Sequence, residues 1–234
     1  YSIVAGITAS GADAYMLHVT TTPSVSFVTR QDEFDCGIMI TASHNPFYDN
    51  GIKVINKYGE KLDDETTLLI EAYLDGALDE LGVTGEDLPL AHRENIGQIV
   101  DYVSGRNRYV GYLISIASHS YKDLRIGLDC ANGASWMIAK AVFDALGAHT
   151  YVTGNQPNGL NINLGVGSTH IENLQKLDET LEIEPMQGFT LKETSPEAAF
   201  HLLGSEMRRH SEETPISPLW QDIYRFFDEN QNWE

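Results

Sequence analysis

The sequence has few basic residues, few cysteines and no long apolar run. Only 15 Lys and Arg stand against 34 Asp and Glu among 234 residues, so the formal net charge is −19. A nucleic-acid partner would need a basic face that displaces counterions from its phosphates, and this composition argues against one. The same charge gives no general attraction for an anionic sugar phosphate, so local positive charge must bind such a ligand.

The two cysteines, Cys36 and Cys130, each lie at one end of an apolar run. This setting predicts small buried residues, neither metal ligands nor a disulfide pair, and a reducing cytoplasmic compartment. No apolar run is long enough to predict a membrane span, and no signal-peptide pattern is present. With 42% hydrophobic and 21% charged residues, the composition is typical of a soluble globular protein.

Short apolar runs alternate with helical patterns, which predicts an α/β fold of layered sheets flanked by helices. The pattern begins inside a helix at Tyr1, so we expect an incomplete first domain over residues 1–120. A second incomplete α/β unit is expected over residues 121–180, and an acidic helical tail over residues 181–234. The predicted strands are 14–19, 36–41, 51–56, 124–130 and 149–153; the predicted helices are 1–10, 24–30, one starting at 63 or 64, 99–118, 135–146 and one starting at 170.

The most informative stretch is a polar loop between two apolar segments. Cys36–Thr41 and Gly51–Asn56 predict two buried strands, and residues 42–50 between them read Ala-Ser-His-Asn-Pro-Phe-Tyr-Asp-Asn. A loop held between two buried strands is a rigid position for a reactive group. Its serine, Ser43, offers a hydroxyl that is a poor nucleophile unless a base takes its proton or it already carries a transferable group.

Around Ser43 the sequence offers a proton carrier, a cation and two amides. His44 can exchange a proton near neutral pH, and Lys53 supplies positive charge for a phosphate or a developing alkoxide. The side-chain amides of Asn45 and Asn50 can donate hydrogen bonds to oxygen atoms. No Gly-x-Ser-x-Gly elbow surrounds the serine, so these groups suit phosphoryl transfer better than acyl transfer. Residue types alone leave an ordinary structural turn as an equal alternative.

A second loop, Gly154–Gly165, is long and rich in glycine and asparagine, and it precedes the helix predicted from His170. A loop that leads into a helix N-terminus can cradle an anion. Asn-Gly turns are also ordinary connections between elements, and that structural interpretation is the stronger one for this loop.

The run from Thr41 to Lys53 resembles the phosphoserine loop of the α-D-phosphohexomutase family. Leu128–Ala134, Pro157–Asn163 and Gly167–Gln175 resemble the second domain of that family, so the resemblance covers about residues 1–177. It implies a serine that donates a phosphate to a hexose phosphate and a reaction that passes through a hexose bisphosphate. The form of the loop is most similar to the branch that interconverts glucosamine 6-phosphate and glucosamine 1-phosphate. The phosphomannomutase and phosphoglucomutase branches are the alternatives.

By this resemblance, Ser43 would carry the phosphate and give one oxygen to Mg²⁺. Lys53 would be a cationic or proton-handling catalytic residue, and His44 would support the loop and its phosphate. Asn45 and Asn50 would contact the substrate, a hexosamine phosphate or hexosamine bisphosphate. The acidic metal loop of the family, Asp-Gly-Asp-Gly-Asp-Arg, does not occur, and neither do its sugar-reading and phosphate-binding domains. We therefore expect a fragment with little or no turnover alone, and neither a nucleic-acid nor a membrane partner.

Residues 178–234 do not resemble this family. They carry 13 of the 34 acidic residues and four of the 15 basic ones. One helical pattern spaces Trp220, Tyr224 and Phe227 as i, i+4 and i+7, which suits a helix that binds a protein partner. The same pattern suits a helix that packs back on its own chain, and the tail could also be an artefactual fusion. A non-catalytic interaction protein that acts through this tail is the alternative function.

Overall fold

The computed structural model describes residues 1–82, 90–118 and 120–180. It has the α/β fold that the sequence predicts, and the expected tail helices lie outside the described residues. None of the helices in these ranges is long and apolar enough to cross a membrane. The helices and strands are α1 (Ser2–Ala9), β1 (Ala14–Met16), α2 (Thr22–Gln31), β2 (Cys36–Thr41), β3 (Gly51–Asn56), α3 (Asp64–Asp75), β4 (Ile99–Asp101), α4 (Val103–Ser115), β5 (Arg125–Asp129), α5 (Ala139–Ala145), β6 (His149–Thr153) and α6 (Glu172–Thr180), with short 3₁₀ turns at Leu78–Leu81, Arg93–Asn95 and Ala134–Met137.

The described strands form three two-stranded sheets. β1 pairs with β4 in parallel, β2 with β3 antiparallel, and β5 with β6 in parallel. The helix predicted from Ile99 was wrong at its start, because Ile99–Asp101 is strand β4 and the helix begins at Val103. The register pairs Ala14 with Ile99, so a partner 85 positions earlier in the chain decides the conformation of this short run.

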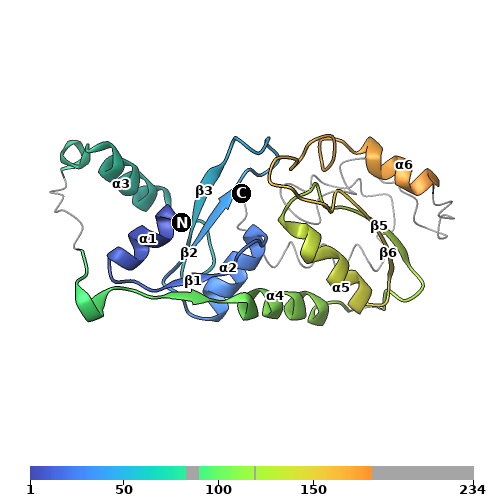
Figure 1. Cartoon of the computed structure of the whole chain (residues 1–234), viewed down its shortest axis with the longest axis horizontal. Coiled ribbons are helices and arrows are strands. Elements are labelled where there is room, and N and C mark those ends of the chain that lie inside the picture. Colours follow the sequence, from blue (N-terminus) through green and yellow to red (C-terminus); the bar gives the residue numbers. More distant parts are fainter. Residues whose placement is uncertain (83–89, 119, 181–234) are drawn as a thin grey trace.

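Helix α4 connects the part of the chain up to β4 with the part from β5 onward, and it runs along one side of both (Figure 1). Its buried Tyr109 packs with Ile138 and Val142 of the α5 region, and Phe27 of α2 packs against the same cluster. The rings of Phe27 and Tyr112 stack with centroids 4.7 Å apart. Because one helix packs on both α2 and α5, it fixes the sheet that carries Ser43 relative to β5 and β6.

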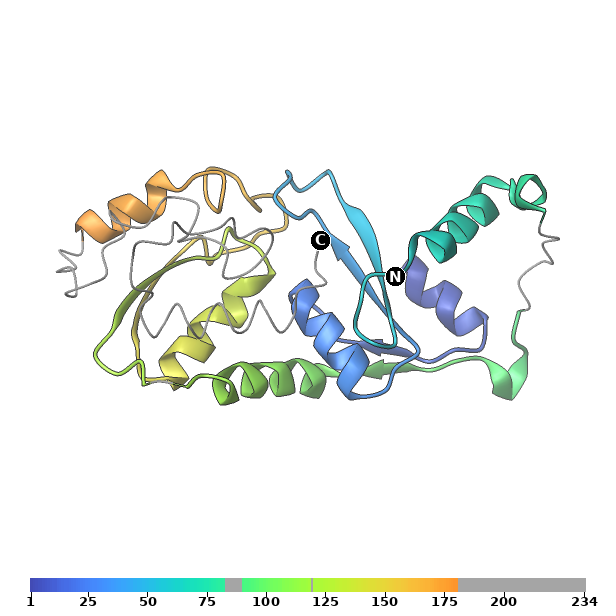
Figure 2. The same ribbon diagram turned by 180° about the vertical axis from the view of Figure 1, so that it is seen from behind.

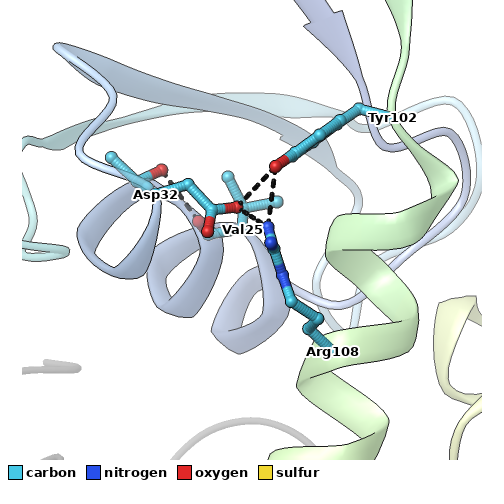
Figure 3. Close-up of polar contacts among 5 residues, drawn as sticks. Val25, Asp32, Tyr102 and Arg108 are labelled. Carbon is cyan, nitrogen blue, oxygen red and sulfur yellow. Dashed lines mark hydrogen bonds and ion pairs between the residues drawn. The ribbon is translucent and has the colours of Figure 1, made fainter.

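A polar cluster ties the end of α2 to the start of α4 (Figure 3). The Tyr102 hydroxyl donates to Asp32 Oδ2 at 3.1 Å, and Arg108 donates to the Tyr102 hydroxyl at 2.7 Å and pairs with Asp32. The Arg108 guanidinium also lies 5.5 Å from the centre of the Tyr102 ring. The Asp32 side chain is only 14% exposed, so these donors satisfy a largely desolvated carboxylate.

The β2–β3 hairpin packs one face on α2 and leaves much of the other face to solvent. Gly37 and Ile55 are buried, but Ile40 and Ile52 are more than half exposed. The prediction of two buried strands was therefore wrong at these positions, and so was the prediction that Cys36 is buried, because its side chain is exposed. Cys130 is buried as predicted, in the core between β5 and α5.

Candidate active site

Ser43 lies at the tip of the hairpin, in the loop that joins β2 to β3. The register pairs Thr41 with Gly51, so residues 42–50 close the hairpin without a further rung. Ala42 is buried and anchors the start of the loop, whereas Ser43 and His44 are exposed. Ser43 has a φ of 53°, a left-handed conformation that few residues other than glycine adopt. The backbone thus presents the serine hydroxyl outward in a defined geometry.

Local hydrogen bonds impose this loop conformation. The Ser43 N–H donates to Thr41 Oγ1 at 3.0 Å, and the Asn45 N–H closes a turn on the Ala42 carbonyl at 2.9 Å. A second turn follows, in which the Asn50 side-chain amide donates to the Phe47 carbonyl at 2.6 Å. Asn50 therefore supports the loop from within, and its predicted substrate contact stays a prediction.

His44 and Lys53 lie at different distances from the hydroxyl. His44 Nδ1 is 3.5 Å from Ser43 Oγ, the long limit of a hydrogen bond, and either group can donate, depending on the tautomer. Lys53 pairs with Met39 in the register, so it shares a hairpin face with Thr41. Lys53 is exposed, and its side chain makes no hydrogen bond or ion pair with the described residues. The structure brings His44 to Ser43, and it leaves the catalytic role of Lys53 as a prediction.

A residue that the sequence interpretation missed, Asn163, contacts this loop from the other part of the chain. Its side-chain Nδ2 donates to the carbonyl of Ser43 at 2.9 Å and to that of Asn45 at 2.8 Å. Figures 1 and 2 both show the hairpin tip beside the segment that precedes α6. The sequence signals here were the Asn- and Gly-rich loop, for which ordinary turns were the stronger interpretation, and the family resemblance of Pro157–Asn163, which assigned Asn163 no role.

Asp129, at the end of β5, organises the loops behind Asn163. Its Oδ1 accepts the Ala131 N–H at 2.8 Å and its Oδ2 accepts the Gly167 N–H at 2.8 Å. A Cβ at Gly154 would lie 2.6 Å from Asp129 Oδ1, so this carboxylate sits against bare backbone. The segment after β5 and the segment after β6 thus meet around one carboxylate. No contact shows the anion cradle considered for residues 154–165, and that role stays a prediction.

The described residues do not provide a metal site of their own. Across 1–82, 90–118 and 120–180, no group of three or more His, Cys, Asp or Glu lies close enough to hold an ion. Mg²⁺ takes about six oxygen ligands in near-octahedral geometry. One phosphate on Ser43 would supply only part of that set, so these side chains alone do not fit the ion.

Comparison with protein families finds two different matches along the chain. The family described as phosphoglucomutase/phosphomannomutase, alpha/beta/alpha domain I, matches residues 1–79. The family described as ATP-dependent helicase/deoxyribonuclease AddB fifth domain matches residues 194–234. The second match lies wholly within residues 178–234, the segment that does not resemble the phosphohexomutase family.

The curated relatives are phosphoglucosamine mutases. One from Lachnospira eligens is 63% identical over 177 residues, which are 76% of this chain and 38% of the relative. One from Clostridioides difficile is 45% identical over 175 residues, which are 75% of this chain and 38% of the relative. The chain thus spans well under half the length of the relatives it matches.

Among solved structures, a phosphoglucomutase/phosphomannomutase family protein from Burkholderia thailandensis superposes with a TM-score of 0.53. It is 24% identical, and the match covers 77% of this chain and 38% of that protein. At this identity the likeness concerns the fold alone. It agrees with the α/β architecture described above.

Proposed function

Because this chain belongs to the phosphohexomutase family over about its first 177 residues, we propose that it carries the phosphoryl-donor loop of a phosphoglucosamine mutase, with Ser43 as the phosphate carrier. The observation that carries the proposal is the exposed serine, held in a left-handed conformation at a hairpin tip beside a histidine. The parent reaction interconverts glucosamine 6-phosphate and glucosamine 1-phosphate. Residues 1–120 form its first domain and residues 121–180 part of its second, in a cytoplasmic protein.

The chemistry consists of two phosphoryl transfers at Ser43 Oγ. A sugar hydroxyl of the hexosamine phosphate attacks the phosphorus on Ser43, and the bond between phosphorus and Oγ breaks. The sugar hydroxyl loses its proton, the serine oxygen gains one, and a hexosamine bisphosphate forms. Ser43 Oγ then attacks the other phosphate of this bisphosphate, which returns the phosphoserine and releases the isomeric monophosphate. Positioning and charge stabilisation supply most of the catalysis in such transfers.

The groups around Ser43 suit this chemistry. His44, with Nδ1 3.5 Å from Oγ, can give a proton to the leaving serine oxygen and take it back in the second transfer. Lys53 supplies the cation that a transferring phosphoryl group needs, from the hairpin face that it shares with Thr41. The Asn45 side chain is available to a substrate oxygen, because only its backbone is engaged by the described residues.

Mg²⁺ is proposed only for the whole parent enzyme, where an oxygen of the Ser43 phosphate would be one ligand. The described residues lack the remaining ligands, so no step proposed for this chain passes through the metal. The chain covers 38% of its Lachnospira eligens relative. We therefore expect these 234 residues alone to accept phosphate but to turn over slowly, if at all.

Mass spectrometry of the peptide that contains Ser43 tests the proposal. The purified chain is incubated with glucosamine 1,6-bisphosphate, and Ser43→Ala is treated in parallel. Phosphate on Ser43 that is absent from the Ser43→Ala peptide is the expected result. A folded chain whose Ser43 stays unmodified, or whose phosphate appears equally in the variant, contradicts the proposal.

A second candidate function rests on the tail. Residues 194–234 match a different family from residues 1–79. In this alternative the chain is an interaction protein that binds a protein partner through its C-terminal segment. Deleting residues 178–234 separates the two functions. If the tail is an independent binding segment, its removal abolishes the binding of a protein partner and leaves Ser43 phosphorylation unchanged.

A further inference from the structure

We infer that Asn163 is a positioning residue for the phosphoryl-donor loop. One side-chain amide from the second part of the chain holds the two backbone carbonyls that flank His44, and through them it fixes Ser43. This inference rests on the proposed function, because it concerns how the donor serine is held for transfer. Its contact spans 120 positions of sequence between Asn163 and Ser43.

The contact uses the full donor capacity of a primary amide. Nδ2 carries two hydrogens, and each meets one carbonyl, that of Ser43 at 2.9 Å and that of Asn45 at 2.8 Å. A carboxylate has no hydrogen to give, and a hydroxyl has only one. The residue type is therefore matched to the pair of acceptors. The acceptors belong to the turn that contains Ser43, whose own φ is 53°.

The backbone of Asn163 is itself held by the segment that follows β5. Its N–H donates to the Ala131 carbonyl at 2.8 Å, and its φ of 58° is one that asparagine tolerates better than most residues. Gly167 packs closely against Ala131, since a Cβ there would lie 2.7 Å from the Ala131 Cβ. Asp129, at the end of β5, holds both the Ala131 and Gly167 N–H groups. The restraint on Ser43 thus runs back to strand β5.

Loss of the two Asn163 hydrogen bonds should affect the donor loop more than the fold. Among the described residues, no other hydrogen bond joins Ser43, His44 or Asn45 to the part of the chain after residue 120, and both core clusters lie elsewhere. Two neutral hydrogen bonds shift a local opening equilibrium by roughly tenfold. A loop that opens tenfold more often presents Ser43 correctly for less time. Phosphoryl transfer to Ser43 should slow while the cores stay intact.

Two variants and a matched control test this role in the full chain. Asn163→Asp keeps the shape and the tolerance for a left-handed backbone but removes both donated hydrogen bonds. Asn163→Gly keeps the backbone freedom and adds no charge. Asn161→Asp is the control, because it changes the same chemistry in the same loop. The hydrogen bonds of the Asn161 side chain within the described part of the chain join it to residues 156 and 158.

Amide hydrogen exchange and phosphorylation are measured on each protein. We expect exchange in the peptide that spans Ser43–Asn50 to be about tenfold faster in both Asn163 variants and unchanged in Asn161→Asp. Exchange in β5 and α5 should not change. The initial rate of Ser43 phosphorylation by glucosamine 1,6-bisphosphate should fall about tenfold or more in the same two variants, because misplacing a reacting atom by about 1 Å can cost about a hundredfold in rate.

Each outcome decides the matter. Unchanged exchange in the Ser43 peptide overturns the inference, and so does faster exchange with a wild-type phosphorylation rate, which would make Asn163 merely structural. An effect of equal size in Asn161→Asp also overturns it, because the loop as a whole would then be responsible. A wild-type chain that takes no phosphate fails differently, since it overturns the proposed function itself and reduces Asn163 to a structural contact.

Discussion

Replacing Gly37 with alanine tests whether the hairpin that carries Ser43 is held by close packing on α2. Gly37 lies in β2, and a Cβ there would overlap Thr29 Oγ1 and lie 2.9 Å from Val25 Cγ1. Both neighbours are nearly inaccessible, with Thr29 3% and Val25 6% exposed. Thr29 Oγ1 also donates to the Val25 carbonyl at 2.8 Å, so it cannot turn aside without losing that bond.

The expected cost follows from two opposing terms. Forcing an extra methyl group into a packed interior costs about 1 to 3 kcal/mol. Replacing glycine with alanine at an ordinary φ returns about 0.4 to 1 kcal/mol, because the unfolded chain loses freedom. The free energy of unfolding of Gly37→Ala should therefore fall by about 1 to 2 kcal/mol.

Urea unfolding followed by circular dichroism measures this change. Gly51→Ala is the control, because Gly51 lies in the neighbouring strand and a Cβ there would meet nothing within 4 Å. The control should be as stable as the wild type or slightly more so. If Gly37→Ala were no less stable than Gly51→Ala, the close approach of α2 and β2 would be refuted.

Two further predictions concern stability. Burial raises the pKa of the Cys130 thiol from 9.0 to about 11, so the unfolded chain ionises first as the pH rises. The free energy of unfolding should fall by up to about 2 to 3 kcal/mol between pH 9 and 11. Urea titrations should show that Cys130→Ala loses this part of the decline. An identical decline in the variant would contradict the assignment of this effect to the Cys130 thiol. Tyr102→Phe removes the hydroxyl that bonds Asp32 and should cost about 1 kcal/mol in the same assay. Tyr15→Phe should cost little, since its hydroxyl makes no hydrogen bond to the described residues, and equal losses would argue against the cluster in Figure 3.

Local signals were enough to predict the hairpin. Two short apolar runs flank a polar segment with a proline and an Asn-Gly pair, and the strands begin and end where the sequence predicts, at Cys36–Thr41 and Gly51–Asn56. The strand His149–Thr153 was predicted with the same bounds. In the hairpin, the residues that set the conformation lie within the segment or directly beside it, because the two strands pair with each other across residues 42–50.

Features that depend on distant partners could not be predicted. Ile99–Asp101 became a strand because β1 offers a parallel partner, whereas its apolar residues fit a helix equally well. Cys36 is exposed because only one face of the hairpin is covered, and sequence alone does not show which. The contact of Asn163 with the Ser43 loop needs the two parts of the chain to be placed side by side. The predicted roles of Ser43, His44 and Lys53 stay predictions.

The most direct measurement is mutase turnover in a chimera, because it supplies the length that this chain does not cover. Residues 1–177 would replace the matching segment of the Lachnospira eligens relative, with which they share 63% identity. Glucosamine 1-phosphate formed from glucosamine 6-phosphate would be followed with and without Ser43→Ala. We expect turnover comparable with that of the Lachnospira eligens parent, and its loss in the Ser43→Ala chimera. Turnover that survives Ser43→Ala would contradict the claim that this serine carries the phosphate.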